Sequence, residues 1–155
     1  MDKAQPSSPS LTLHHVGYVV ADIAAESVVL AEGLGYHLVT EIIHDPLQEA
    51  LVRFLRLPGD RAFLELVCPD GPQSPLQRAL DRGVTLHHLC YAVADIRAAL
   101  AALRSRGMSL VRKPLPAVAF SGNLIAWVLR RDRLLVELVE LTDTAGSLAL
   151  SSIAG

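Results

Sequence analysis

The sequence predicts an α+β fold made of two related modules, each with the element order β-α-β-β-β. The main observation is an internal repeat: the stretch 13–23 (LHHVGYVVADI) returns at 86–96 (LHHLCYAVADI), an offset of 73 residues. In both copies an apolar run typical of a buried strand leads into an Asp that is followed by a helical pattern. With 155 residues, 51% of them hydrophobic, the chain can bury a core as one domain or as two small fused modules.

The first module, residues 11–69, is expected to contain one helix between its first and second strands. Asp22 can cap the N-terminus of this helix, and Gly33 and Gly35 favour the left-handed backbone that ends it. Turn signals at 44–46 (HDP) and 58–60 (PGD) separate the later strands. The expected elements are strands at 12–20, 36–43, 50–57 and 61–67 and a helix at 23–32.

The second module, residues 84–141, repeats this plan after a short connector helix within 70–83. Ser74 and Pro75 begin the connector helix and Gly83 ends it. Asp95 caps the main helix of the module, which Gly107 ends. The remaining elements are strands at 85–93, 109–111, 126–129 and 134–141, a helix up to residue 106, and an irregular loop at 121–123.

The two ends of the chain and its composition limit the classes of function. Residues 1–10 are polar and rich in Pro and Ser, so we expect a disordered leader, and 142–155 forms a weakly patterned tail that is either frayed or packed on a second subunit of a homodimer. A net charge of -2 without a basic run argues against nucleic-acid and membrane-surface partners, and no apolar run is long enough to span a bilayer. Cys68 and Cys90 form no motif, so we expect two reduced, non-catalytic thiols in a cytoplasmic protein that acts on a small molecule.

Matched acidic residues suggest where the chemistry lies. Each module ends on an apolar strand that carries one Glu, Glu65 in LELV and Glu137 in VELV. A carboxylate within a buried strand is costly unless it is paired, protonated or bound to a cation. Each module also has a His pair near its start, so two imidazoles and two carboxylates are available to bind a divalent metal. The two negative charges of the carboxylates would offset the two positive charges of the ion.

Strand alternation indicates which histidine of each pair joins this site. Successive side chains point to opposite faces of a strand. The face with His14 and its counterpart His87 is bulky and apolar, as expected beneath a helix, whereas the face with His15 and His88 carries smaller neighbours and leaves room for a ligand. We therefore predict that His14 and His87 face the packed side. The predicted metal ligands are His15, Glu65, His88 and Glu137.

With this set of residues, the sequence resembles the vicinal oxygen chelate superfamily, which includes glyoxalase and bleomycin-resistance proteins. The resemblance covers residues 11–141. The resemblance implies that the paired modules form a cup-shaped mixed sheet with helices outside, and that the same four residues hold a divalent ion such as Co, Ni, Zn, Mn or Mg. The segments HVGY at 15–18, GLGY at 33–36, SPL at 74–76, LHH at 86–88 and LVEL at 135–138 are most similar to the methylmalonyl-CoA epimerase subfamily.

The epimerase resemblance implies an isomerase that transfers a proton through a metal-bound enolate of a small acyl substrate such as an acyl-CoA. Epimerases of this type usually have Gln where this chain has Glu65 and a Glu base where it has Leu51. Glu137 or Glu65 is therefore a candidate base, with Glu49 as a further candidate.

Three other functions are compatible with the superfamily. Glu65 favours a glyoxalase-type lyase. A metal-free binding or resistance protein is the alternative outside enzymes, although it would not need four matched ligands. An iron-dependent oxygenase is disfavoured because such sites use two His and one carboxylate.

Overall fold

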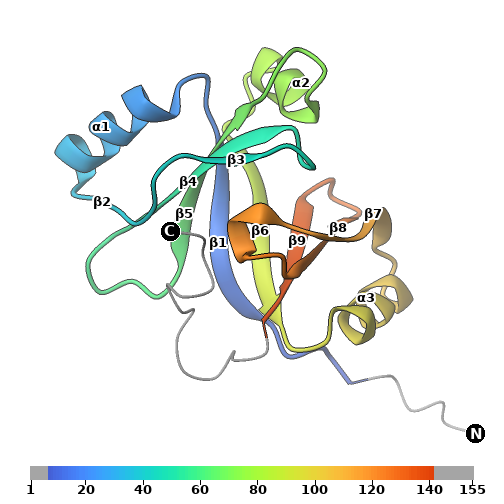
Figure 1. The fold of residues 1–155 in the computed structure, drawn as a ribbon. Helices are drawn as coiled ribbons and strands as arrows, with labels where there is room; N and C mark the ends of the chain where they lie inside the picture. Colours follow the sequence, from blue (N-terminus) through green and yellow to red (C-terminus); the bar gives the residue numbers. More distant parts are fainter. Residues whose placement is uncertain (1–6, 142–155) are drawn as a thin grey trace, which may run out of the picture.

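The computed structural model describes residues 7–141, which form one mixed β-sheet with helices on its outer side (Figure 1). The first half contains β1 (Thr12–Val19), α1 (Ile23–Leu34), β2 (His37–Leu38), β3 (Ile43–Asp45), β4 (Ala50–Arg56) and β5 (Phe63–Pro69). The connector helix is α2 (Pro75–Asp81). The second half contains β6 (Leu86–Val93), α3 (Ile96–Ser105), β7 (Ser109–Pro116), the 3-10 helix η1 (Val118–Phe120), β8 (Leu124–Leu129) and β9 (Leu135–Glu140).

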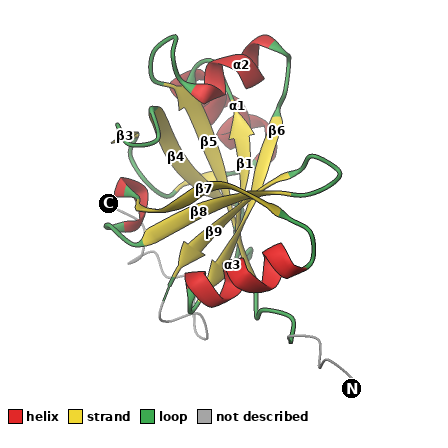
Figure 2. Ribbon diagram, turned by 90° about the vertical axis from the view of Figure 1, so that its right-hand side faces the viewer, coloured by secondary structure: helices red, strands yellow, loops and turns green. Residues whose placement is uncertain are grey.

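The strand order β2-β4-β5-β1-β6-β9-β8-β7, with β3 paired to β4, shows the duplication directly. In each half the first strand pairs in parallel with the last, β1 with β5 and β6 with β9. The halves join where β1 and β6 pair antiparallel in the middle of the sheet (Figure 2). The prediction of an α+β fold made of two related modules is therefore confirmed.

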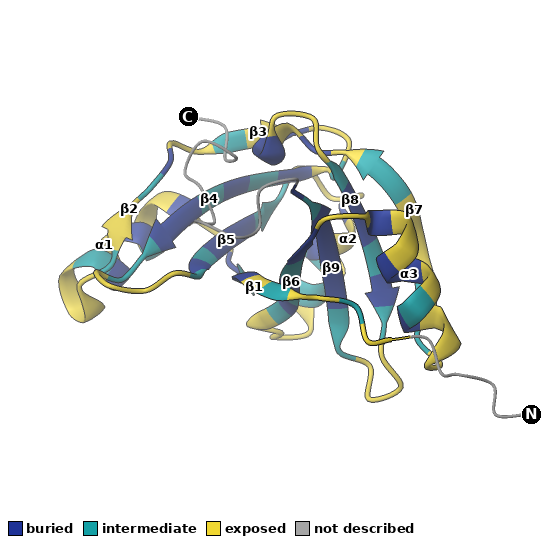
Figure 3. Cartoon of the chain, turned by 90° about the horizontal axis from the view of Figure 1, so that it is seen from below, coloured by how far each residue is buried: buried dark blue, intermediate teal, exposed yellow. Residues whose placement is uncertain are grey.

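The sheet is curved (Figure 3), with two apolar clusters beneath the outer helices and a third on the concave side. Ile23 and Leu30 of α1 pack on Leu55 and Leu66 of the sheet, and a corresponding cluster lies beneath α3. The largest cluster lies on the concave side and includes residues from both halves, such as Phe54. The helices are thus outside, and the concave side is left for the site.

Matched side chains begin the two main helices. Asp22 Oδ1 accepts a hydrogen bond from Ala25 N–H, and Asp95 Oδ1 accepts one from Ala98 N–H, both at 3.0 Å. Because each carboxylate satisfies a backbone donor that the first helical turn leaves free, the helices start where the repeated Ala-Asp-Ile predicts.

The single strand predicted at 36–43 is wrong. Two short strands, β2 and β3, replace it, and both pair with β4. Thr40 interrupts the ladder, because its Oγ1 accepts a hydrogen bond from Phe54 N–H at 3.1 Å while its own N–H donates to Phe54 O at 3.3 Å. The chain then resumes pairing at Ile43, so β3 runs through the predicted break as far as Asp45.

In the second half, β7 is longer than the predicted 109–111 and extends to Pro116. It can contain Pro114 and Pro116 because it is the last strand of the sheet, where a missing N–H costs no ladder hydrogen bond on the open side. Its pairing with β8 shifts register twice. Residues 121–123 form a turn, and Ser121 has a positive φ of 53°.

The predicted tail 142–155 and residues 1–6 of the predicted leader lie outside the described residues. Within residues 7–141, none of the helices is both long and apolar enough to cross a membrane.

Candidate metal centre and active site

Four buried side chains converge on the concave side of the sheet. His15 lies on β1, Glu65 on β5, His88 on β6 and Glu137 on β9, and their potential ligand atoms all lie within 4.8 Å of one another. The central strand pairing explains this convergence, because Gly17 is the register partner of both Glu65 and His88. The structure therefore brings together all four residues predicted as metal ligands.

The ring nitrogen Nε2 of His15 lies at the centre of the group. It is 2.5 Å from Glu65 Oε2, 3.0 Å from His88 Nε2 and 3.7 Å from Glu137 Oε1. His88 Nε2 is also 4.0 Å from Glu65 Oε2. Each residue thus directs a nitrogen or oxygen atom with a lone pair to one small region.

Gly17 makes room for His88. A Cβ atom at Gly17 would lie 2.0 Å from Cε1 of the His88 ring and under 3.0 Å from both ring nitrogens. Gly17 has no positive φ, so its backbone conformation does not require a glycine; the close approach of the His88 ring does. The ring of His88 therefore packs directly over the β1 backbone, which fixes its place in the site.

The prediction that His14 and His87 face the packed side beneath a helix is wrong. The β1–β6 pairing has two irregularities, one between Leu13 and His15 and one between Gly17 and Tyr18, where the partner steps from His88 to Leu86. The residues passed over are His14 and His87. Such a bulge breaks the alternation of side chains along a strand. His14 therefore lies beside His15, and His87 beside His88, instead of on the opposite face of the sheet.

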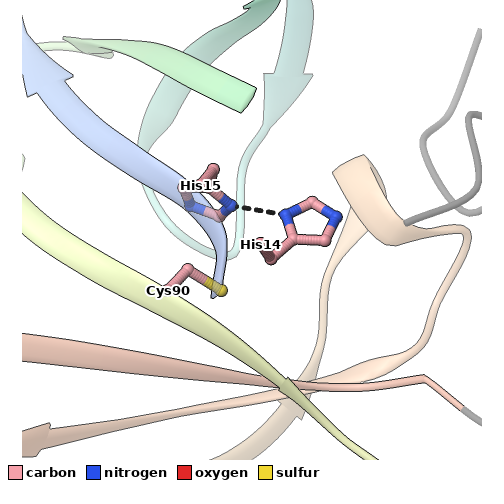
Figure 4. Close-up of side chains that lie close together, drawn as sticks. All are labelled: His14, His15 and Cys90. Atoms are coloured by element: carbon pink, nitrogen blue, oxygen red, sulfur yellow. Dashed lines mark hydrogen bonds between the residues drawn. The ribbon is translucent and has the colours of Figure 1, made fainter. Parts of the chain in front are cut away.

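Each predicted ligand histidine is held by the histidine before it. The Nδ1 atoms of His14 and His15 are 2.8 Å apart (Figure 4), and those of His87 and His88 are 2.7 Å apart. One nitrogen of each pair must donate and the other must accept. These contacts occupy the Nδ1 atoms and leave the Nε2 atoms of His15 and His88 facing the other ligands.

Burial sets the charge state of the site. It lowers the pKa of His15 to about 3 and lowers that of His88 well below its usual value, so both rings are neutral near pH 7. Burial raises the pKa of Glu65 to about 7, and burial together with the charge of Glu65 raises that of Glu137 well above its usual value. A hydrogen bond from the buried thiol of Cys90 partly opposes the rise at Glu137.

This donor set fits a divalent cation. Two neutral imidazoles and two carboxylates are a common mixed ligand set, and the two carboxylate charges would neutralise the ion. Glu137 Oε1 is buried without a hydrogen-bond partner among the described residues, which is costly unless something else binds it. His15, Glu65, His88 and Glu137 would be the ligands.

A cavity of about 180 Å³ opens beside the cluster. Glu65, His88 and Glu137 line it, and Trp127 forms another part of its wall with its ring 4.8 Å from that of His88. Most of the other lining residues are apolar and come from both halves of the chain. A ligand in this cavity would therefore be largely desolvated and next to the predicted metal ligands.

The cavity also contains Asp45, which the sequence reasoning missed. Asp45 ends β3, is 2% exposed, and lines the cavity. Its Oδ1 accepts hydrogen bonds from the N–H groups of Leu47 and Gln48 at 3.1 and 3.2 Å, which fix the carboxylate in place. The signal was hidden because the sequence HDP was interpreted only as a strand break.

The two positions considered for a base on the third strand do not face the cavity. Leu51 packs with the apolar cluster beneath α1, whereas its neighbours Ala50 and Val52 line the cavity. Glu49 is exposed, lies in the turn before β4 with a positive φ of 51°, and is absent from the described lining. Of the carboxylates near this strand, the structure brings Asp45 and not Glu49 to the site.

The chain is similar to known proteins in sequence. Residues 14–127 match the family model described as the glyoxalase/bleomycin resistance protein/dioxygenase superfamily. The chain is 29% identical over 122 residues to an ethylmalonyl-CoA/methylmalonyl-CoA epimerase of Cereibacter sphaeroides, an alignment that covers 77% of this chain and 89% of that protein.

Solved structures show the same fold. A methylmalonyl-CoA epimerase from Mycobacterium tuberculosis superposes with a TM-score of 0.76 at 27% identity, covering 88% of this chain and 93% of that chain. A hypothetical protein from Bacillus halodurans has the same TM-score at 22% identity, covering 89% of this chain and 99% of the other.

Proposed function

Because the chain belongs to the glyoxalase/bleomycin resistance protein/dioxygenase superfamily, we propose that it is a divalent-metal-dependent isomerase. Its reaction would be an epimerisation, in which a proton is removed from and returned to the carbon beside the carbonyl of a small acyl-CoA. The observation that carries the proposal is the cluster of four buried ligand groups within 4.8 Å, with two carboxylates that need a cation.

The bound cation would supply positive charge to stabilise the negative charge that develops on substrate oxygens when a neighbouring carbon loses a proton. The apolar wall of the cavity strengthens this effect, because electrostatic interactions are stronger where water is excluded. His15 and His88 are neutral, so each ring carries a single proton. With that proton on Nδ1, the lone pair of Nε2 is free to bind the ion.

Asp45 and Glu137 are the proposed proton carriers. They come from different halves of the chain, on β3 and β9, and both line the cavity. Asp45 accepts the proton from the substrate carbon on one face, and the Glu137 carboxylate, which also holds the cation, passes a proton from solvent to the other face. Exchange with solvent then resets both groups.

The names of the relatives support the proposed substrate class. Two of them, at 29% and 27% identity, are named as epimerases of methylmalonyl-CoA, one of them also of ethylmalonyl-CoA. Such substrates have a carboxylate and a thioester carbonyl on the same carbon, so that two oxygens could approach the cation together. We propose an acyl-CoA of this type, with the acyl group in the cavity.

The test combines metal analysis with isotope exchange. The purified protein should bind about one divalent ion per chain, and His88→Ala should not. The metal-loaded protein should then incorporate deuterium from heavy water at the α-carbon of methylmalonyl-CoA. A protein that binds no divalent metal, as isolated or after reconstitution, would contradict the metal site; metal binding without exchange across a panel of acyl thioesters would contradict the isomerase.

A glyoxalase-type lyase is the second candidate, and Glu65 is the observation that favours it. A second ionisable ligand in place of an amide gives the site one more negative charge and one more possible base. Turnover of a glutathione hemithioacetal, without deuterium exchange into acyl-CoA, would support this activity over epimerisation.

A further inference from the structure

The amide of Gln48 is held at the cavity in one orientation. Gln48 lies in the turn between β3 and β4 and lines the cavity. Arg112 Nη1, on β7, donates to Gln48 Oε1 at 3.3 Å, and Arg112 Nη2 donates to Leu47 O at 2.9 Å. Because a guanidinium can only donate, the atom that faces Arg112 must be the amide oxygen, and the nitrogen must point elsewhere.

That nitrogen is left without a partner. Gln48 Nε2 is sealed from solvent and makes no hydrogen bond within residues 7–141. A buried donor that stays unpaired costs stability, so such atoms in a folded protein require an explanation. The turn is also rigidly held, since Asp45 Oδ1 accepts a hydrogen bond from the backbone N–H of Gln48. The donor is therefore preorganised to bind an acceptor atom supplied by a ligand.

The charge beside Gln48 indicates the chemistry of that acceptor. Arg112 lines the cavity, and its guanidinium carries a permanent positive charge. Asp45 lines the same cavity, and its Oδ1 atom is already engaged by the backbone N–H groups of Leu47 and Gln48. An amide N–H next to a guanidinium suits an anionic oxygen better than a neutral one, since charge-assisted hydrogen bonds are the stronger.

We propose that Gln48 and Arg112 form a subsite for the carboxylate of the substrate, with Gln48 Nε2 as donor to one carboxylate oxygen. The inference rests on the proposed function for its acyl-CoA, and it extends that function by making the protein selective for acyl groups with a free carboxylate. A turn from one half and an edge strand from the other build the subsite, so it does not belong to the duplicated ligand set.

The test uses a matched pair of ligands and a near-isosteric variant. Malonyl-CoA and its terminal amide, carbamoylacetyl-CoA, are titrated calorimetrically into the metal-loaded protein. Gln48→Glu keeps an acceptor for Arg112 but replaces the donor with an oxygen. Gln48→Met removes the donor without adding charge and serves if the first variant does not fold. Gln73→Glu, at an exposed position outside the cavity lining, is the control for added charge.

We expect Gln48→Glu to weaken malonyl-CoA binding by about tenfold or more, and to change binding of the amide by much less, because the amide can donate to the new carboxylate. Gln48→Met should reduce the preference for malonyl-CoA, while Arg112 and the cation keep part of it. Equal weakening of both ligands, or no change in either, would overturn the subsite. If the wild-type protein holds metal but binds neither thioester, the proposed substrate fails; malonate and malonamate then test the subsite, and no preference for malonate overturns it.

Discussion

Replacing Glu65 by Gln should change how the stability of the metal-free protein depends on pH. Burial raises the pKa of Glu65 from 4.5 to about 7, so between these values the folded protein holds a proton that the unfolded chain has lost. This contribution to the free energy of unfolding is therefore complete below pH 4.5 and is lost as the pH rises through 7. The shift corresponds to about 3 kcal/mol, most of it lost between pH 5 and pH 8.

The assay is urea unfolding with a chelator present, at pH 5 and pH 8, for the wild-type protein and Glu65→Gln. The buried histidines, whose lowered pKa values act in the opposite sense, are present in both proteins, so the comparison reports Glu65 together with its electrostatic coupling to His88 and Glu137. Relative to the variant, the wild-type protein should lose about 2–3 kcal/mol between the two pH values. Glu32→Gln, at an exposed position on α1, should behave as wild type.

Adding a divalent metal tests the same carboxylate from the opposite direction. Binding to the folded state alone stabilises it, and the ion needs Glu65 ionised, so the stabilisation should be larger at pH 8 than at pH 5. Parallel pH curves for the wild-type protein and Glu65→Gln in the absence of metal would refute the reasoning, because Glu65 would then not titrate differently in the folded and unfolded states.

Three further substitutions test the surroundings of the site. Asp45→Asn should lower the rate of deuterium exchange about 100-fold or more while the metal content stays unchanged, since it removes the proposed base and no ligand; loss of metal would instead make Asp45 a ligand. His14→Phe should weaken metal binding about tenfold or more in calorimetry, because it removes the partner of the His15 Nδ1 atom. Gly17→Ala should abolish metal binding by displacing the His88 ring, and a crystal structure with that ring in place would contradict this.

The repeat allowed the fold and the convergence of His15, Glu65, His88 and Glu137 to be predicted, because the same pattern occurs in both halves of the chain. A buried Glu or a strand His alone has several explanations, but matched pairs at a common offset have few. The register of the sheet then brings these residues together. Gly17 pairs with Glu65 on one side and, because the two copies of the first strand pair with each other, with His88 on the other.

The bulges at His14 and His87 could not be predicted in the same way. Alternation assumes that every residue of a strand pairs, and a bulge is a property of two strands together, not of either sequence. Asp45 was not predicted as a site residue for a related reason. The sequence HDP is a strong local break signal, yet pairing with β4 at Ala50 carries the strand through Asp45 and brings its carboxylate to the cavity.

The predicted ligands are related by the duplication, but the surroundings of the two histidine pairs differ. The His14 ring is fully buried, with the rings of Phe54, Phe63 and Phe120 within 6.2 Å, and its Nε2 atom has no hydrogen-bond partner among the described residues. His87 is only partly buried and lines the cavity with His88. If Nδ1 of each ligand histidine donates, the Nε2 proton of His14 must lie against aromatic rings, whereas that of His87 can reach a ligand. A ligand in the cavity can therefore contact the imidazole of His87, whereas the imidazole of His14 is enclosed by aromatic rings from both halves.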